Sequence, residues 1–275
     1  MRRHEFLGHL HRLVAPRNYL EIGVSDGRSL TLAGVPSIGI DPAPKVQSPL
    51  GPDAKVVRAT SDAFFARTDP LEHLRNEPRS VRDRLLGRTP IARANGSPTL
   101  DLVFIDGMHL LEFALRDFMN VERYAGWTSV IVFDDVLPRD VDEAARDRHT
   151  KFWAGDVFKI IEVLRRYRPD LVILPVDTVP TGTLVVIGGD PDNRVLQAAY
   201  DEIVRTWALP DPQAPPESVL ARRDAVAPER VVEAGVWSDL IRAREDQVER
   251  AIGYAGIRAE LLSLMPIGSA PVTSR

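Results

Sequence analysis

A chain of 275 residues is long enough for one large domain, or for a domain with an appendage. Its formal net charge of -4 argues against a general nucleic-acid-binding protein, and its 44% hydrophobic and 27% charged residues are ordinary for a soluble globular protein. The absence of cysteine excludes disulfides, thiolate metal sites and cysteine nucleophiles.

The hydrophobic pattern predicts short apolar strands that alternate with helices. A short amphipathic helix is expected at 4–14, and "NYLEIGVSDGRSL" (18–30) should run from a strand through a glycine-bearing turn into a short helix. Further strands are expected at 37–41, 54–59, 100–106, 129–135, 170–176 and 182–189. Further helices are expected from residue 61 and over 110–124, 155–168, 193–209 and 219–265, whereas the polar residues 67–99 should form irregular helix and loop.

This alternation predicts an α/β fold with a mainly parallel sheet that is covered by helices on both faces. Only about five residues separate the last two strands, which leaves no room for a crossover helix, so these strands should pair as an antiparallel hairpin. We expect one domain over 1–190, with an N-terminal helix in 1–17. Residues 191–275 should form a helical C-terminal extension, with a Pro-rich linker near 210–218.

The first candidate site follows the first predicted strand, because ligands of open parallel sheets bind at the carboxyl ends of the strands. "EIGVSDG" places Glu21, Gly23 and Gly27 around a tight turn. Its glycines would let the backbone approach a ligand, and the helix after the turn would present free N–H groups. Asp41 ends the second strand, about 20 residues after Glu21, where a carboxylate can bind ribose hydroxyls.

The ligand of this turn is not expected to be a dinucleotide. The fingerprint G-x-G-x-x-G, started at Gly23, meets Ser25 and Arg28 where glycines are required. The acidic side chains nearby would also disfavour a pyrophosphate. A positively charged ligand without phosphates, such as S-adenosylmethionine (SAM), fits better, and the alternative is a turn that only connects a strand to a helix.

These motifs resemble the class I SAM-dependent methyltransferases. The resemblance is carried by "YLEIGVSDGRSL", "IGIDP", "FIDGMH" and "VIVFDD", in this order, over roughly residues 15–190. It is closest to the metal-dependent O-methyltransferase group of sugar and natural-product tailoring. It implies a Rossmann-like, seven-stranded sheet of order 3-2-1-4-5-7-6 with the last strand antiparallel.

The resemblance also implies which residues contact SAM. In chain order these are Glu21 and Gly23 near the methionine part, Ser25 and Gly27 in the turn, Asp41 on the ribose, Ser61 or Asp62 near the adenine, and Asp106. Ser25 departs from the family pattern, because many members have glycine at this position.

A second candidate site combines three aspartates with a histidine. Asp106 ends one strand, and Asp134 and Asp135 end the strand expected beside it, about 4.8 Å away. Without a cation such carboxylates would repel one another, and all-oxygen ligation suits Mg²⁺. His109, beyond the turn at Gly107, could take the proton of a metal-activated hydroxyl, and the resemblance implies the same roles.

Plainer interpretations of these four side chains remain open. Asp134 or Asp135 could cap a loop or a helix, and Asp106 could serve SAM binding alone. His109 could be a helix-start histidine whose hydrogen bonds are satisfied. Many methyltransferases of this fold use no metal, and a lone histidine or aspartate then suffices as the base.

We therefore expect an enzyme that uses SAM, assisted by Mg²⁺, to methylate a hydroxyl of a sugar or secondary metabolite. The alternatives are a metal-independent small-molecule methyltransferase, a non-catalytic SAM-fold binding protein and, less favoured, an NAD(P)-dependent oxidoreductase. The N-terminus lacks the apolar core of a signal peptide and no segment approaches the ~18 apolar residues of a membrane span, so we expect a cytoplasmic protein. Its partner should be a small-molecule acceptor, not nucleic acid or a membrane, and the C-terminal helices could form a homo-oligomer.

Overall fold

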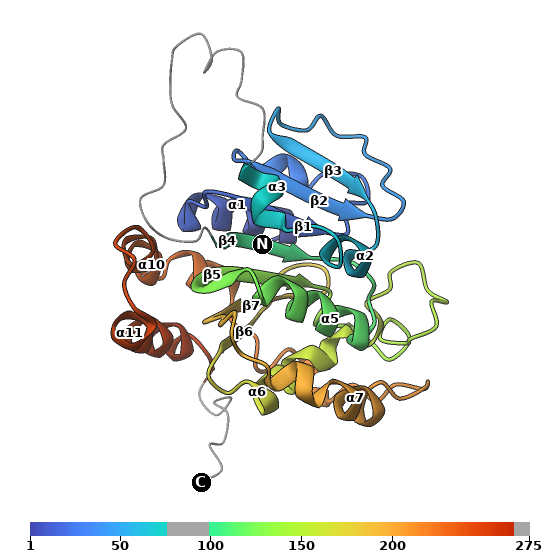
Figure 1. Ribbon diagram of the computed structural model, residues 1–275. Helices are drawn as coiled ribbons and strands as arrows, with labels where there is room; N and C mark the ends of the chain where they lie inside the picture. Colours follow the sequence, from blue (N-terminus) through green and yellow to red (C-terminus); the bar gives the residue numbers. More distant parts are fainter. Residues whose placement is uncertain (76–98, 267–275) are drawn as a thin grey trace.

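One seven-stranded sheet runs through the molecule (Figure 1), as seen in the computed structural model, which describes residues 1–75 and 99–266. The strands are β1 (Tyr19–Ile22), β2 (Ser37–Asp41), β3 (Ala54–Arg58), β4 (Leu100–Ile105), β5 (Ala125–Asp134), β6 (Val172–Val176) and β7 (Thr183–Ile187). Their order is β3-β2-β1-β4-β5-β7-β6. β7 pairs antiparallel with both β5 and β6, and the other neighbouring pairs are parallel. The predicted fold, strand order and antiparallel hairpin are confirmed.

The central strands are buried on both faces, which explains why their sequences are nearly continuous apolar runs. Every residue of β1, β4, β6 and β7 is buried. β3, at the edge of the sheet, is only half-buried and carries Lys55 and Arg58. Side chains alternate between the two faces along each strand, so the sheet supports two separate hydrophobic layers.

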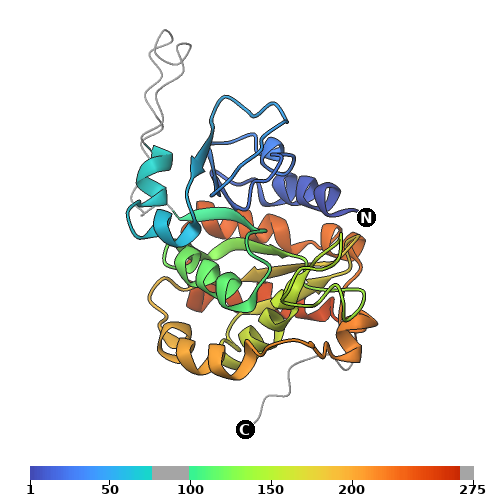
Figure 2. The same cartoon turned by 90° about the vertical axis from the view of Figure 1, so that its right-hand side faces the viewer.

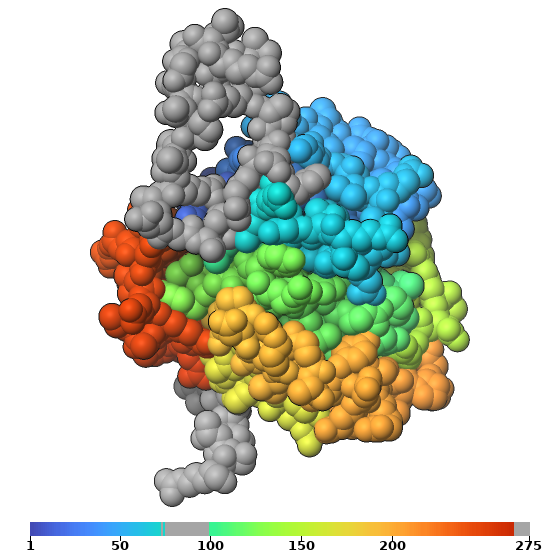
Figure 3. All heavy atoms as spheres, in the orientation of Figure 1, coloured from blue at the N-terminus to red at the C-terminus, as the bar shows by residue number. Residues whose placement is uncertain are grey.

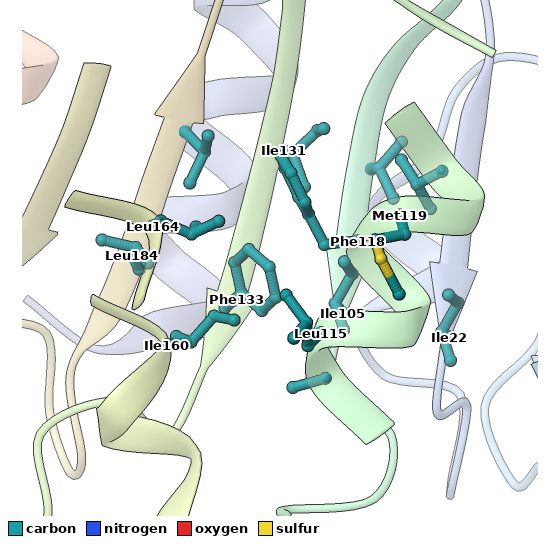
Figure 4. Close-up of a cluster of buried hydrophobic side chains, with 14 of the residues drawn as sticks. Ile22, Ile105, Leu115, Phe118, Met119, Ile131, Phe133, Ile160, Leu164 and Leu184 are labelled. Carbon is teal, nitrogen blue, oxygen red and sulfur yellow. The ribbon is translucent and has the colours of Figure 1, made fainter. Parts of the chain in front are cut away.

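The first layer is built by helices that follow β3, β4, β5 and β7. They are α2 (Ser61–Phe65), α3 (Pro70–Arg75), α5 (Leu111–Glu122), the 3-10 segment η2 (Gly155–Lys159), α6 (Ile160–Tyr167) and α7 (Val195–Trp207). Figure 4 shows Leu115 and Phe118 of α5 against Ile105 and Phe133 of the sheet. Figure 3 shows α5 (green) and α7 (orange) spread over this face.

The second layer joins the two ends of the described chain. α1 (Arg3–Val14) shares one hydrophobic cluster with α9 (Pro228–Val232), α10 (Val236–Glu245) and α11 (Arg250–Ser263). Arg244 of α10 donates to the carbonyls of Val14 and Ala15 at 2.8 Å each. Tyr254 of α11 donates to the carbonyls of Asp170 at 2.8 Å and Ile187 at 3.1 Å. The helices after residue 190 thus cover a face of the sheet, whereas the predicted domain division at that residue stays a prediction.

Two predicted helices differ from the structure. The turn after β1 leads only into a single 3-10 turn, η1 (Leu30–Leu32), so no α-helix presents free N–H groups there. The predicted helix at 219–265 is divided into the end of α8 (Glu217–Leu220), α9, α10 and α11. Left-handed backbone at Arg222 (φ 52°) and Gln247 (φ 53°) interrupts it, because a right-handed helix cannot continue through such residues.

Most of the segment 67–99, predicted as irregular, lies outside the described residues; its first part forms α3. In the described part of the chain, no helix combines the length and the apolar character needed to cross a membrane.

Candidate active site

A cavity of about 660 Å³ lies where the parallel strands end. Figure 2 looks onto this edge of the sheet, with α1 (blue) on one side and α5 (green) on the other. Eight predicted site residues line the cavity: Gly23, Ser25, Asp41, Ser61, Asp62, Asp106, His109 and Asp135. Three do not line it: Glu21, Gly27 and Asp134.

The turn after β1 is built around a close backbone contact at Gly23. The amide of Gly23 donates to the Ile40 carbonyl at 2.8 Å, and its φ is +89°. A Cβ atom at this position would lie 1.8 Å from the backbone oxygen of Asp106. Only glycine permits this approach, which brings the ends of β1 and β4 together at the floor of the cavity.

Asp41 organises the same turn. Its carboxylate accepts hydrogen bonds from the amides of Val24 (3.0 Å), Ser25 (2.9 Å) and Ala43 (2.7 Å). Each carboxylate oxygen has two acceptor positions, so Asp41 can still accept from ligand hydroxyls in the cavity that it lines. Ser25 has left-handed backbone (φ 48°), a conformation that favours glycine, which gives a physical reason for the glycine of many family members.

Glu21 was predicted to contact SAM, but in the structure its side chain does not line the cavity. Its side chain is fully buried, and its carboxyl group accepts from the hydroxyls of Tyr19 and Ser29 at 2.7 Å each. Burial raises the pKa of Glu21 to about 8, although these two hydrogen bonds act in the opposite direction. Gly27 supports the turn with left-handed backbone (φ +84°) but does not reach the cavity.

The far end of the cavity is polar and includes a residue that the sequence analysis missed. Ser61, the first residue of α2, donates a short hydrogen bond to Asp117 of α5. Asp117 is buried and lines the cavity, and its burial raises its pKa to about 7. Asp62 is paired with Arg116, with 3.0 Å between Oδ2 and Nε. Asp117 could have been noticed, because helical periodicity places this carboxylate on the buried face of an amphipathic helix.

Asp106, His109 and Asp135 form the reactive cluster of the cavity. His109 Nε2 lies 3.2 Å from Asp106 Oδ1, and His109 Nδ1 lies 3.3 Å from Asp135 Oδ2. These three residues each offer one ligand atom within 4.8 Å of the others, so they could together hold a metal ion. Thr181 donates a further short hydrogen bond to Asp135.

The predicted group of three aspartates is not brought together, because Asp134 lies apart from the cluster. Asp134 is the last residue of β5, whereas Asp135 follows the strand with left-handed backbone (φ 58°), so their side chains leave in different directions. Asp134 is buried and forms a close ion pair with Arg3 of α1, whereas Asp135 lines the cavity. Arg3 also lies 3.4 Å from Asp106, so one guanidinium partly balances both carboxylates. No sequence pattern points to Arg3, since it lies far from Asp134 along the chain.

The environment of His109 favours its charged form. Burial alone would lower its pKa, but the hydrogen bond to Asp106 and the charge of Asp135 outweigh this effect and raise the pKa to about 9. Trp153 stacks on the imidazole, with ring centroids 5.2 Å apart, and its carbonyl lies 2.7 Å from Nδ1. A Cβ at Gly155 would lie 1.8 Å from the His109 carbonyl, so this glycine permits the close contact of the two segments.

The loop after β5 (residues 135–154) is anchored to its surroundings. Arg146 pairs with Glu112 of α5 at 2.6 Å and with Asp156 at 2.7 Å. Trp153 Nε1 donates to the carbonyl of Ala145 at 2.6 Å. These contacts position Trp153 beside His109. In Figure 1 this loop (yellow-green) projects from the edge of the sheet where the site lies.

Comparison with known proteins finds a family model that matches part of the chain. Residues 20–136 match a family model described as a methyltransferase domain. This segment runs from β1 to just beyond β5 and contains every predicted site residue. The match confirms the predicted resemblance to class I methyltransferases over this segment.

Solved structures with a similar arrangement have low sequence identity. They include cofactor-bound Rv0187 from MTB (19% identity, TM-score 0.48, 68% of this chain and 80% of that chain). An O-methyltransferase from Bacillus cereus in complex with SAH has 16% identity and a TM-score of 0.42 over the same shares. The O-methyltransferase TomG from Streptomyces achromogenes, in complex with SAM, has 17% identity and a TM-score of 0.39, again over 68% and 80%. No curated protein sequence matches the chain.

Proposed function

We propose that this protein transfers a methyl group from SAM to a hydroxyl oxygen of a small molecule, in the class of sugars and secondary metabolites. The observation that carries the proposal is the shared cavity. It joins the turn organised by Asp41, where a nucleoside can bind, to a histidine held between two carboxylates, where a proton can be accepted.

The residues present fit SAM in size and in polarity. A cavity of about 660 Å³ is within the usual range for cofactor sites, roughly 300–1,000 Å³. Gly23 leaves room beside the strand ends, Asp41 offers acceptor positions to ribose hydroxyls, and the pair Ser61–Asp117 offers polar atoms at the far end. Bound SAM would supply the methyl group; Glu21, being buried, would support the turn from behind.

His109 is the proposed base, and its second nitrogen is the reactive atom. The carbonyl of Trp153 can only accept, so Nδ1 carries a hydrogen in this arrangement and Nε2 is the atom that exchanges its proton. In the reaction the hydroxyl oxygen gains the methyl carbon, the sulfur–methyl bond breaks with its electron pair remaining on sulfur, and the hydroxyl proton passes to Nε2. Asp106 and Asp135 would orient the imidazole and stabilise its charged form. Because they raise the pKa of His109 to about 9, only its unprotonated fraction can accept the proton, and turnover should rise with pH up to about 9.

We also propose that a divalent cation takes part, as the sequence predicts. Its protein ligands would be two of the three predicted aspartates. Asp106 and Asp135 would hold Mg²⁺, and the ion would lower the pKa of the acceptor hydroxyl and fix its position. Asp134 is not assigned to it, because its partner is Arg3.

A metal-independent methyltransferase is the second candidate, and one observation favours it. His109 lies between Asp106 and Asp135, and Arg3 lies beside Asp106, so cationic side chains already balance these carboxylates. A cation between the two aspartates would have to displace the imidazole from this position.

The test is transfer of a labelled methyl group from SAM to a panel of hydroxylated acceptors, with and without EDTA. We expect His109→Asn to lower kcat by about 100-fold or more, the usual effect of losing a general base. His149→Asn, in an exposed side chain of the loop after β5, is the matched control and should retain activity. Loss of turnover in EDTA would support Mg²⁺, and unchanged turnover would leave the metal-independent mechanism. Full activity of His109→Asn would refute the assignment of the base.

A further inference from the structure

A second cavity of about 400 Å³ adjoins the first on the side of α1. The two cavities share Arg3, Asp135 and Trp153 as lining residues, so a molecule in the second cavity would reach the reactive cluster. The remaining lining comes from the start of α1, the turn after β1, the loop after β5 and the turn between β6 and β7. This position suits the acceptor, because Gly23, Asp41, Ser61 and Asp117, the residues proposed to lie against SAM, line the first cavity.

The charges that line the second cavity are mainly positive. Its cationic residues are Arg2, Arg3, Arg28 and Lys151, and its acidic residues are Asp135 and Glu143. His4 also lines the cavity, but burial lowers its pKa and so favours its neutral form. Both acidic side chains have partners within the protein. Glu143 is buried and paired with Arg139 at 2.7 Å, and Asp135 is held by Thr181 and His109.

Two of the cations lack a carboxylate partner among the described residues, although the ammonium group of Lys151 lies 5.8 Å from the centre of the Phe152 ring. Arg3 is engaged by Asp134 and Asp106, and Arg28 is paired with Asp26 at 2.6 Å. Across residues 1–75 and 99–266, neither Arg2 nor Lys151 has a carboxylate partner. The cavity therefore presents uncompensated positive charge on both sides, from α1 and from the loop after β5.

The walls between these cations are apolar. Phe152 and Trp153 contribute aromatic rings, and Val179 and Pro180 contribute the opposite wall. Phe152 is 57% exposed, and Arg139 and Lys151 lie 5.2 and 5.8 Å from the centre of its ring. Such a cavity fits an apolar or aromatic body that carries a negative group.

We propose that the acceptor is an anionic hydroxy compound, with a carboxylate or a phosphate held by Arg2 and Lys151 and its hydroxyl directed to Asp135 and His109. The proposal rests on the proposed function, since it assigns the acceptor of that reaction. Charge-assisted hydrogen bonds from the two cations would fix the orientation of the acceptor, and the aromatic wall would hold its body.

The experiment measures binding of three probes to the full-length chain by calorimetry: para-hydroxybenzoate, phenyl phosphate and the uncharged para-hydroxybenzyl alcohol. Either anion should bind at least about tenfold more tightly than the alcohol, and the double variant Arg2→Gln/Lys151→Gln should remove this difference. Preference for benzoate or for phosphate identifies the anionic group. Arg12→Gln/Arg230→Gln is the matched control, because it makes the same change in net charge at exposed residues that line neither cavity.

Equal binding of the anions and the alcohol, binding of none of the three, or unchanged anion binding by the double variant would overturn the proposal. SAM binding is measured in parallel on the same proteins. If SAM binds but the anions are not preferred, only the acceptor assignment fails. If the anions bind through Arg2 and Lys151 but SAM does not bind, the anion site stands and the proposed function fails.

Discussion

Gly23 and Gly155 hold the segment 106–109 in place from two sides. A Cβ on Gly23 would meet the carbonyl oxygen of Asp106, and a Cβ on Gly155 would meet the carbonyl oxygen of His109, each at 1.8 Å. Both glycines also have positive φ, +89° and +60°. The positions of Asp106 and His109 therefore depend on two residues that have no side chain at all.

Gly23→Ala should destabilise the protein and impair ligand binding together. The methyl group would force apart the ends of β1 and β4, and alanine is strained at this φ. We expect the free energy of unfolding to fall by at least about 2 kcal/mol, measured by denaturant titration. Gly34→Ala is the control, because nothing lies within 4 Å of its added Cβ. Equal stability of the two variants would contradict the close contact at Gly23.

The raised pKa of Glu21 should make the free energy of unfolding depend on pH. Burial raises its pKa in the folded protein to about 8 from an ordinary value of 4.5, with the nearby charge of Asp106 acting in the same direction and that of Arg3 against it. Because the folded pKa is the higher one, the contribution of Glu21 is complete below about 4.5 and is lost as the pH rises through about 8.

Thermal unfolding across this pH range tests the role of Glu21. The melting temperature of the wild type should decrease with rising pH more steeply than that of Glu21→Gln, whose side chain stays neutral. Glu233→Gln, at an exposed carboxyl beyond α9, should follow the wild type. Parallel curves for the wild type and Glu21→Gln would show that the carboxyl group is not held neutral by burial.

At the scale of elements, the sequence predicts where the strands lie, but it does not predict which parts of the fold each helix packs against. The strands at the centre of the sheet are apolar runs bounded by polar turns, so each can be recognised from its own short stretch of sequence. The separation of Asp134 from Asp135 depends on the left-handed backbone of Asp135 after the end of β5, which the apolar pattern of the strand does not predict. The pairing of Arg3 with Asp134 depends on where α1 packs, and local sequence does not contain that information.

The helices α10 and α11 should be required for stability, because they cover the second face of the sheet. Leu240→Ala in α10 removes a fully buried side chain from the cluster shared with α1 and the sheet. We expect a loss of about 2–5 kcal/mol in the free energy of unfolding. Ile252→Ala in α11, at a side chain that is 76% exposed, should change it by less than about 0.5 kcal/mol. A negligible effect of Leu240→Ala would mean that α10 is dispensable for the fold.

For the whole molecule, the sheet order followed from the sequence because the alternation of elements and the terminal hairpin leave few topologies. The role of α9, α10 and α11 could not be predicted from the sequence, because charged amphipathic helices can pack equally well on their own sheet or on another chain. Their packing on α1 and the sheet accounts for most of their buried apolar residues, and it also fixes α1, whose first residues border both cavities. Assembly into a homo-oligomer stays a prediction.

Calorimetric titration of the full-length protein with SAM tests the central claim most directly. The account predicts saturable binding at micromolar SAM, and a marked loss of affinity in Asp41→Ala, which removes the carboxylate that organises the turn after β1. Asp26→Ala, a nearby aspartate that does not line the cavity, should bind SAM like the wild type. The absence of SAM binding by the wild type would contradict the account.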